Sequence, residues 1–117
     1  MARRARSGPA QLLARPTAGQ RTRDSVHLLG NDLDHVVDLV GAVPSAQIGD
    51  HLGWADVMVH AATSEGFCNA VIEAQAHGVP VVCTDADGLA ENIDPGRTGF
   101  IVPRRQPAPM AERIAQL

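Results

Sequence analysis

The chain has 117 residues, which suits one domain with one hydrophobic core, and its formal net charge at pH 7 is −3. With one Trp, two Phe and no Tyr, it lacks the rings of a base-stacking surface for single-stranded nucleic acid, and no apolar run reaches the roughly 18–20 residues of a membrane span. Its two cysteines set no disulfide framework, so we expect a reducing, cytoplasmic location.

The N-terminal segment is strongly basic. Residues 1–23 hold six arginines and no acidic residue, whereas all 13 acidic residues follow. We interpret residues 1–23 as a disordered, solvated arm and residues 24–117 as the folded domain. A transit peptide, a nucleic-acid-binding arm and a start that is not native coding sequence are the alternatives. A secretory signal is not expected, because no apolar segment follows the arginines.

Helices and strands are expected to alternate along the rest of the chain. A short helix is predicted near residues 22–29, and a continuously apolar segment at 35–40 predicts a buried strand. A helix then opens at Pro44–Ser45, with Ile48 and Leu52 on one face. The further elements are predicted as a strand at 55–62, a loop at 63–68, a helix at 69–78, strands at 80–84 and 99–103 separated by a short helix at 89–93, and a helix from 108 to the end.

This order of elements predicts an α/β fold. Because the strands are continuously apolar instead of alternating, both faces of the sheet must be covered, which favours a parallel sheet with helices on both faces. Right-handed crossovers put every loop that follows a strand on one edge of such a sheet, and ligands bind at that edge. Residues 62–68 follow a predicted strand, so this loop is where function is expected.

The segment "EGFCNAVIEAQAHGVPVV", residues 65–82, carries two glutamates eight positions apart, Glu65 and Glu73. Gly66 would let the backbone turn and approach a ligand, and the amides that follow lie at a predicted helix N-terminus, where phosphate binds. Glu73, within about the first turn, could accept bonds from the ribose diol, and Glu65 from another sugar. Together these describe a nucleotide-diphosphate sugar. The alternative is structural, since the helix dipole stabilises acids near its N-terminus by about 0.3–1 kcal/mol.

No metal site is expected. The five histidines are scattered, none forms an i, i+4 pair with another, and the cysteines have no metal-ligand spacing. Cys83, in the run "VPVVC", is predicted to pack as a small apolar residue, whereas Cys68 is predicted to be partly exposed.

The same segment resembles the signature of the retaining glycosyltransferases of the GT-B fold, family 4 and its relatives. Their pattern is a Glu, seven residues and a second Glu, followed by Ala, a small residue, Gly, a spacer and Pro-Val-Val. The likeness continues through "TDADGLAENI" and "GRTGFIVP" and covers about residues 34–115. The matching residues are Glu65, Gly66, Phe67, Asn69, Glu73, Ala74, Ala76, Gly78, Pro80, Val81, Val82, Gly88, Glu91, Gly96, Gly99 and Pro103.

The resemblance implies roles for these residues. The counterpart of Glu73 holds the ribose of the donor nucleotide, and that of Glu65 contacts the transferred sugar, so Glu65 is the candidate catalytic residue. A sugar is transferred from a nucleotide-diphosphate sugar with retained anomeric configuration, as a hexosyltransferase does, without a cofactor or tightly bound metal. The backbone that holds the diphosphate corresponds to Gly66, Phe67, Cys68, Asn69 and Ala70.

The chain also departs from the pattern. Ala61–Ala62 replaces Pro-Ser, Asp87–Gly88 replaces a pair of glycines, and the basic residues that neutralise the diphosphate have no counterpart. We therefore interpret the chain as a truncated, Rossmann-like donor-binding half of a GT-B fold, whose acceptor domain belongs to missing sequence or a partner chain. The alternatives are a non-catalytic nucleotide-sugar-binding module, an inactive fragment and a GT-B sugar-nucleotide epimerase. No nucleic acid or membrane is expected as a partner.

Overall fold

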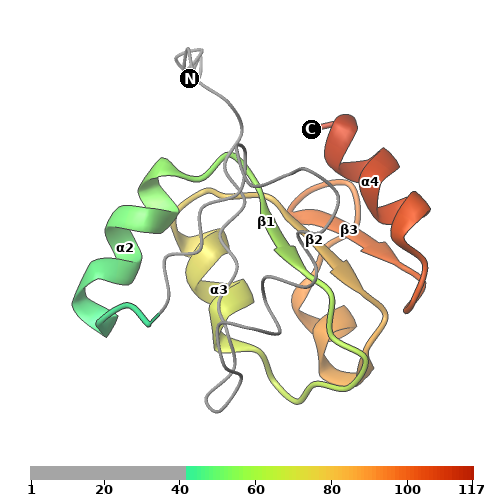
Figure 1. Cartoon of the computed structure of the whole chain (residues 1–117), viewed down its shortest axis with the longest axis horizontal. Coiled ribbons are helices and arrows are strands. Elements are labelled where there is room, and N and C mark those ends of the chain that lie inside the picture. The colour runs from blue at the N-terminus through green and yellow to red at the C-terminus, as the bar shows by residue number, and fades with distance from the viewer. Residues whose placement is uncertain (1–41) are drawn as a thin grey trace. The chain divides into compact units, whose positions relative to one another are not determined.

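The structure is a computed structural model that describes residues 42–117 (Figure 1). The basic arm at 1–23 and the elements predicted near 22–29 and 35–40 lie outside the described residues. Within them, the order of elements follows the prediction: α2 (Ser45–Trp54), β1 (Met58–His60), α3 (Asn69–Ala76), β2 (Val81–Thr84), the 3₁₀ helix η1 (Asp87–Asn92), β3 (Gly99–Val102) and α4 (Pro107–Ala115).

Most element boundaries differ from those predicted by one or two residues, and the first strand differs most. The strand predicted at 55–62 is only Met58–His60, because pairing with β2 covers just these residues. The helix predicted at 69–78 ends at Ala76. Gly78 follows with φ +71°, a left-handed conformation that glycine adopts without steric cost and that commonly ends helices.

The described strands form a three-stranded parallel sheet in the order β1-β2-β3. Met58 lies opposite Val81 in the register of the first pair, and Val82 lies opposite Phe100 in the second. All strands run in one direction, so the loops that follow them share one edge, as the sequence predicted.

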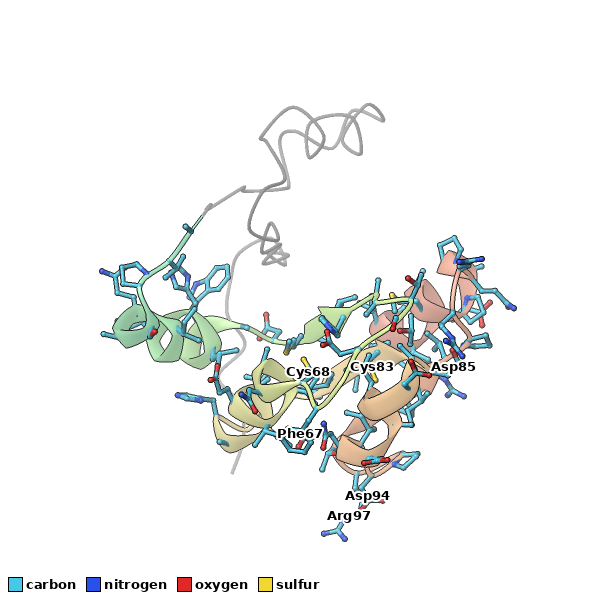
Figure 2. The ribbon with its side chains drawn as sticks, turned by 90° about the horizontal axis from the view of Figure 1, so that it is seen from below. Phe67, Cys68, Cys83, Asp85, Asp94 and Arg97 are labelled. Carbon is cyan, nitrogen blue, oxygen red and sulfur yellow. The ribbon has the colours of Figure 1, made fainter. Side chains whose placement is uncertain are left out.

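Helices cover both faces of this sheet, which confirms the predicted fold class. In Figure 2, α3 and η1 lie on one side of the strands and α4 lies on the other. Every residue of β2 is buried. Side chains alternate along a strand, so Val81 and Cys83 join the core with Leu89 of η1, while α4 covers the opposite face. There, the Arg113 guanidinium lies 4.7 Å from the centre of the Phe100 ring.

No helix among the described residues is long and apolar enough to cross a bilayer.

Candidate functional site

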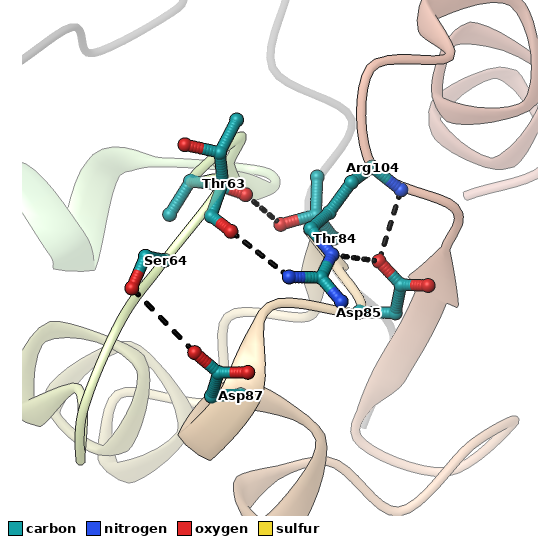
Figure 3. A network of polar contacts seen from close by, with 7 residues as sticks. Thr63, Ser64, Thr84, Asp85, Asp87 and Arg104 are labelled. Atoms are coloured by element: carbon teal, nitrogen blue, oxygen red, sulfur yellow. Dashed lines mark hydrogen bonds and ion pairs between the residues drawn. The ribbon is translucent and has the colours of Figure 1, made fainter.

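Hydrogen bonds connect the loops at the carboxyl edge of the sheet (Figure 3). The buried Thr84 hydroxyl, at the end of β2, donates to the Ala62 carbonyl behind β1. Arg104, which follows β3, donates from Nε to Asp85 Oδ1 at 3.0 Å and from Nη1 to the Thr63 carbonyl at 3.1 Å. The loops after β1, β2 and β3 therefore form one connected surface.

A second set of contacts fastens the turn at 64–66 to the start of η1. The Gly88 amide donates to the Glu65 carbonyl at 3.1 Å, and the Ser64 hydroxyl lies 3.5 Å from Asp87 Oδ2. A Cβ at Gly88 would lie 2.4 Å from the Gly66 carbonyl oxygen. The acid at position 87, which departs from the family pattern, thus contacts the loop that carries Glu65.

Glu65 is half-buried and paired with a histidine that sequence reasoning left out of the site. Its Oε2 lies 3.0 Å from Nε2 of His60, the last residue of β1. Cys68 Sγ lies 3.7 Å from the same nitrogen. The prediction that Cys68 is partly exposed is wrong, since only 7% of it is accessible. A search for paired histidines could not find His60, whose partners are a carboxylate and a thiol.

The N-terminus of α3 presents backbone amides without acceptors. Asn69 is the first helical residue, and Cys68 before it is the N-cap residue. The Cys68 side chain makes no capping hydrogen bond to the helix. The Val71 amide donates to the Cys68 carbonyl at 3.2 Å. The amides that precede it, Phe67 to Ala70, have no acceptor within the part of the chain that the structure describes.

One part of the role predicted for Gly66, that a glycine is needed for the backbone to turn, does not apply in the structure. Its φ is not positive, so the turn does not require glycine there, and a Cβ would meet no atom within 4 Å. The requirement for glycine lies instead at Gly88, which packs against it. The space beside Gly66 is open, and the Phe67 side chain next to it is 66% exposed.

Glu73 is the fifth residue of α3, beyond the first turn, which contains no acidic residue. The helix dipole acts within the first turn, so it does not explain this carboxylate. The side chain is exposed and forms no ion pair within the described residues. Its backbone carbonyl accepts from the His77 amide at 3.2 Å and from His77 Nδ1 at 2.9 Å.

The second cysteine, Cys83, is fully buried beneath this edge, as predicted. Desolvation raises the pKa of its thiol from 9.0 to about 11, with a further contribution from the negative charge that Cys68 can carry. Cys83 is therefore a protonated core residue at neutral pH.

The family described as "Glycosyl transferases group 1" matches residues 10–117. The chain belongs to this family, which confirms the resemblance seen in residues 65–82.

Among named relatives, the D-inositol 3-phosphate glycosyltransferase of Paenarthrobacter aurescens is 36% identical over 85 residues, 70% of this chain and 21% of that protein. The protein of the same name from Corynebacterium kroppenstedtii is 33% identical over 105 residues, 90% of this chain and 22% of that protein. A GDP-mannose-dependent alpha-mannosyltransferase of Mycobacterium tuberculosis is 40% identical over 63 residues, 54% of this chain and 17% of that protein. The chain thus spans about a fifth of these relatives.

Proposed function

We propose that residues 24–117 form the donor-binding part of a hexosyltransferase that takes a sugar from a nucleotide-diphosphate sugar with retained configuration. The observation that carries this proposal is the uncapped N-terminus of α3, which lies directly after Glu65 at the carboxyl edge of the parallel sheet. Ligands of parallel α/β sheets bind at this edge.

The donor diphosphate binds to the backbone of residues 66–70. The amides from Phe67 to Ala70 have no acceptor within the described residues, and the N-terminal end of a helix carries partial positive charge. Both properties favour a phosphate group there. The open space beside Gly66 admits the ligand to the backbone.

Glu73 binds the ribose of the donor. It follows Asn69 by four residues, so the two lie on one face of α3, about 6 Å apart along the helix axis. Its exposed carboxylate is free of ion pairs within the described residues and can accept from both hydroxyls of a vicinal diol. The phosphate and ribose of one nucleotide can reach both sites.

Glu65 is the catalytic residue, in contact with the transferred sugar. Departure of the nucleoside diphosphate requires stabilisation of negative charge, and the α3 amides supply part of it. Arg104 lies at the same edge, but its guanidinium is bonded to Asp85 and Thr63. We assign the remaining positive charge and the acceptor-binding domain to other sequence of a longer protein or a partner chain, since the relatives are about five times longer than the matched part.

A second candidate function is binding of a nucleotide sugar without chemistry. The observation that favours it is that the proposed donor contacts all lie within residues 65–73, a segment that could bind a nucleotide sugar by itself. Incubation of the nucleotide sugar with the chain together with the longer sequence or partner that supplies the acceptor-binding domain would separate the two functions, because only a transferase then releases nucleoside diphosphate.

Calorimetric titration of the purified chain with UDP, GDP and ADP tests the donor site. We expect one nucleotide to bind, and Glu73→Ala to weaken that binding by about 1–3 kcal/mol through loss of the ribose hydrogen bonds. Glu112→Ala is the matched control, because Glu112 is an exposed glutamate on α4, which covers the opposite face of the sheet. Absence of binding to all three nucleotides by a chain with a cooperative unfolding transition would contradict the proposal.

A further inference from the structure

Three potential metal ligands of different chemistry converge at the end of β1. His60 Nε2, Glu65 Oε2 and Cys68 Sγ belong to a group of ligand atoms that all lie within 4.8 Å of one another. His60 ends the strand, Glu65 lies in the following loop and Cys68 is the N-cap of α3. The side chains of His60 and Glu65 are 27% and 33% exposed, which leaves a route from solvent, while the thiol is buried.

The spacing of these atoms fits a tetrahedral zinc ion. Usual bond lengths place an imidazole nitrogen about 3.6 Å from a thiolate sulfur and about 3.4 Å from a carboxylate oxygen on one Zn²⁺. His60 Nε2 lies 3.7 Å from Cys68 Sγ and 3.0 Å from Glu65 Oε2. The second distance must open by a few tenths of an ångström. Glu65 Oε2 and Cys68 Sγ, which lie within 4.8 Å of each other, must come to about 3.6 Å. Glu65 lies in a largely exposed loop.

Hydrogen bonds alone cannot pair all three of these atoms well. A ring nitrogen of histidine carries one proton or one lone pair. Nε2 of His60 therefore cannot make a full hydrogen bond to Glu65 and another to Cys68 at the same time. An ion at the centre of the group would bond to all three atoms at once.

We propose that His60, Glu65 and Cys68 form a binding site for a divalent transition-metal ion of the zinc class. Nitrogen, sulfur and oxygen donors together suit Zn²⁺ or Co²⁺, whereas Mg²⁺ and Ca²⁺ require oxygen ligands. Binding replaces the proton of the Cys68 thiol, which is released to solvent, and leaves the fourth coordination position to water.

The site has a consequence for nucleotide-sugar binding, and this consequence alone rests on the proposed function. Glu65 cannot ligate the ion and contact the donor sugar with the same carboxylate oxygen. Zn²⁺ therefore competes with the sugar of the donor, and it affects a nucleoside diphosphate, which has no sugar at Glu65, less strongly.

Titration of the reduced, metal-free chain with Co²⁺ tests the site without any nucleotide. We expect one Co²⁺ per chain, a near-ultraviolet thiolate-to-cobalt absorption band, and displacement of Co²⁺ by Zn²⁺. Cys68→Ser should abolish the band, and Cys83→Ser, which changes the other buried thiol, should keep it. His60→Gln and Glu65→Gln should each weaken binding about tenfold or more, since even partners outside the ligand shell are worth 10–100-fold.

Circular dichroism melts identify any variant that fails to fold. Cys68 is buried, so if Cys68→Ser unfolds, the half-exposed His60→Gln and Glu65→Gln decide the question. Absence of a thiolate band in the unmodified chain would overturn the proposal, as would a band that survives in folded Cys68→Ser or an affinity unchanged by His60→Gln. Nucleotide binding is not measured in these titrations, so failure of the proposed function leaves their result intact.

Discussion

Gly66 and Gly88 pack against each other at the candidate site, but only one of the two positions requires a glycine. A Cβ at Gly66 would meet nothing within 4 Å, whereas one at Gly88 would lie 2.4 Å from the Gly66 carbonyl oxygen and 2.7 Å from its carbon. Gly88 also donates its amide to the Glu65 carbonyl. It is therefore the glycine that sets the position of the Glu65 turn.

Gly88→Ala is expected to destabilise the fold by about 1–3 kcal/mol, because the methyl group must push the backbone of residues 65–67 away. Gly66→Ala, the control, should change the free energy of unfolding by less than about 0.5 kcal/mol. Urea denaturation followed by circular dichroism measures both. Equal effects of the two substitutions would show that the contact at Gly88 is not restrictive.

At the scale of elements, the pairing of β3 with β2 depends on a residue without a side chain. Gly99 lies opposite Val81, and a Cβ on it would lie 1.9 Å from the Val81 carbonyl oxygen. The contact is with backbone, so a rotamer change cannot relieve it. Packing thus explains why a glycine stands at position 99, where the chain matches the family pattern. Packing does not explain the match at Glu73.

Gly99→Ala should cost about 3 kcal/mol or more, since the start of β3 must separate from β2. Gly53→Ala in α2 is the control, because a Cβ there meets nothing within 4 Å and alanine favours a helix over glycine by about 0.5–1 kcal/mol. Thermal unfolding and hydrogen exchange of the β2 amides measure the difference. Retention of wild-type exchange rates in Gly99→Ala would refute the assigned contact.

For the whole molecule, burial of Cys83 couples folding to alkaline pH. The pKa of this thiol is raised from 9.0 to about 11 in the fold, so above pH 9 the unfolded chain loses the proton first. The unfolded state then binds fewer protons than the native state, and stability falls as pH rises.

Between pH 9 and pH 11, this coupling should lower the free energy of unfolding by about 2–3 kcal/mol. Below pH 9 it should have no effect. Comparison with Cys83→Ala isolates the contribution, because the substituted chain lacks this titration. A difference between the two unfolding free energies that stays constant across this pH interval would contradict the assignment.

The sequence by itself determined the class of the fold and predicted the place of the candidate site. Continuous apolar segments identify buried strands and glycines end helices, because burial and backbone conformation are set by residues close in sequence. The motif from Glu65 to Val82 lies in one continuous segment, which forms a loop, a helix and the start of a strand. Its pattern could therefore be recognised in the sequence, and it identified the family.

Only the tertiary structure decided which side chains meet at the carboxyl edge. The contacts of Arg104 with Thr63, and of Gly88 with Gly66, join segments that no local pattern relates. They depend on the register of three parallel strands, which is set by packing across the whole sheet. The pairing of His60 with Glu65 likewise depends on how the loop folds back over the end of β1.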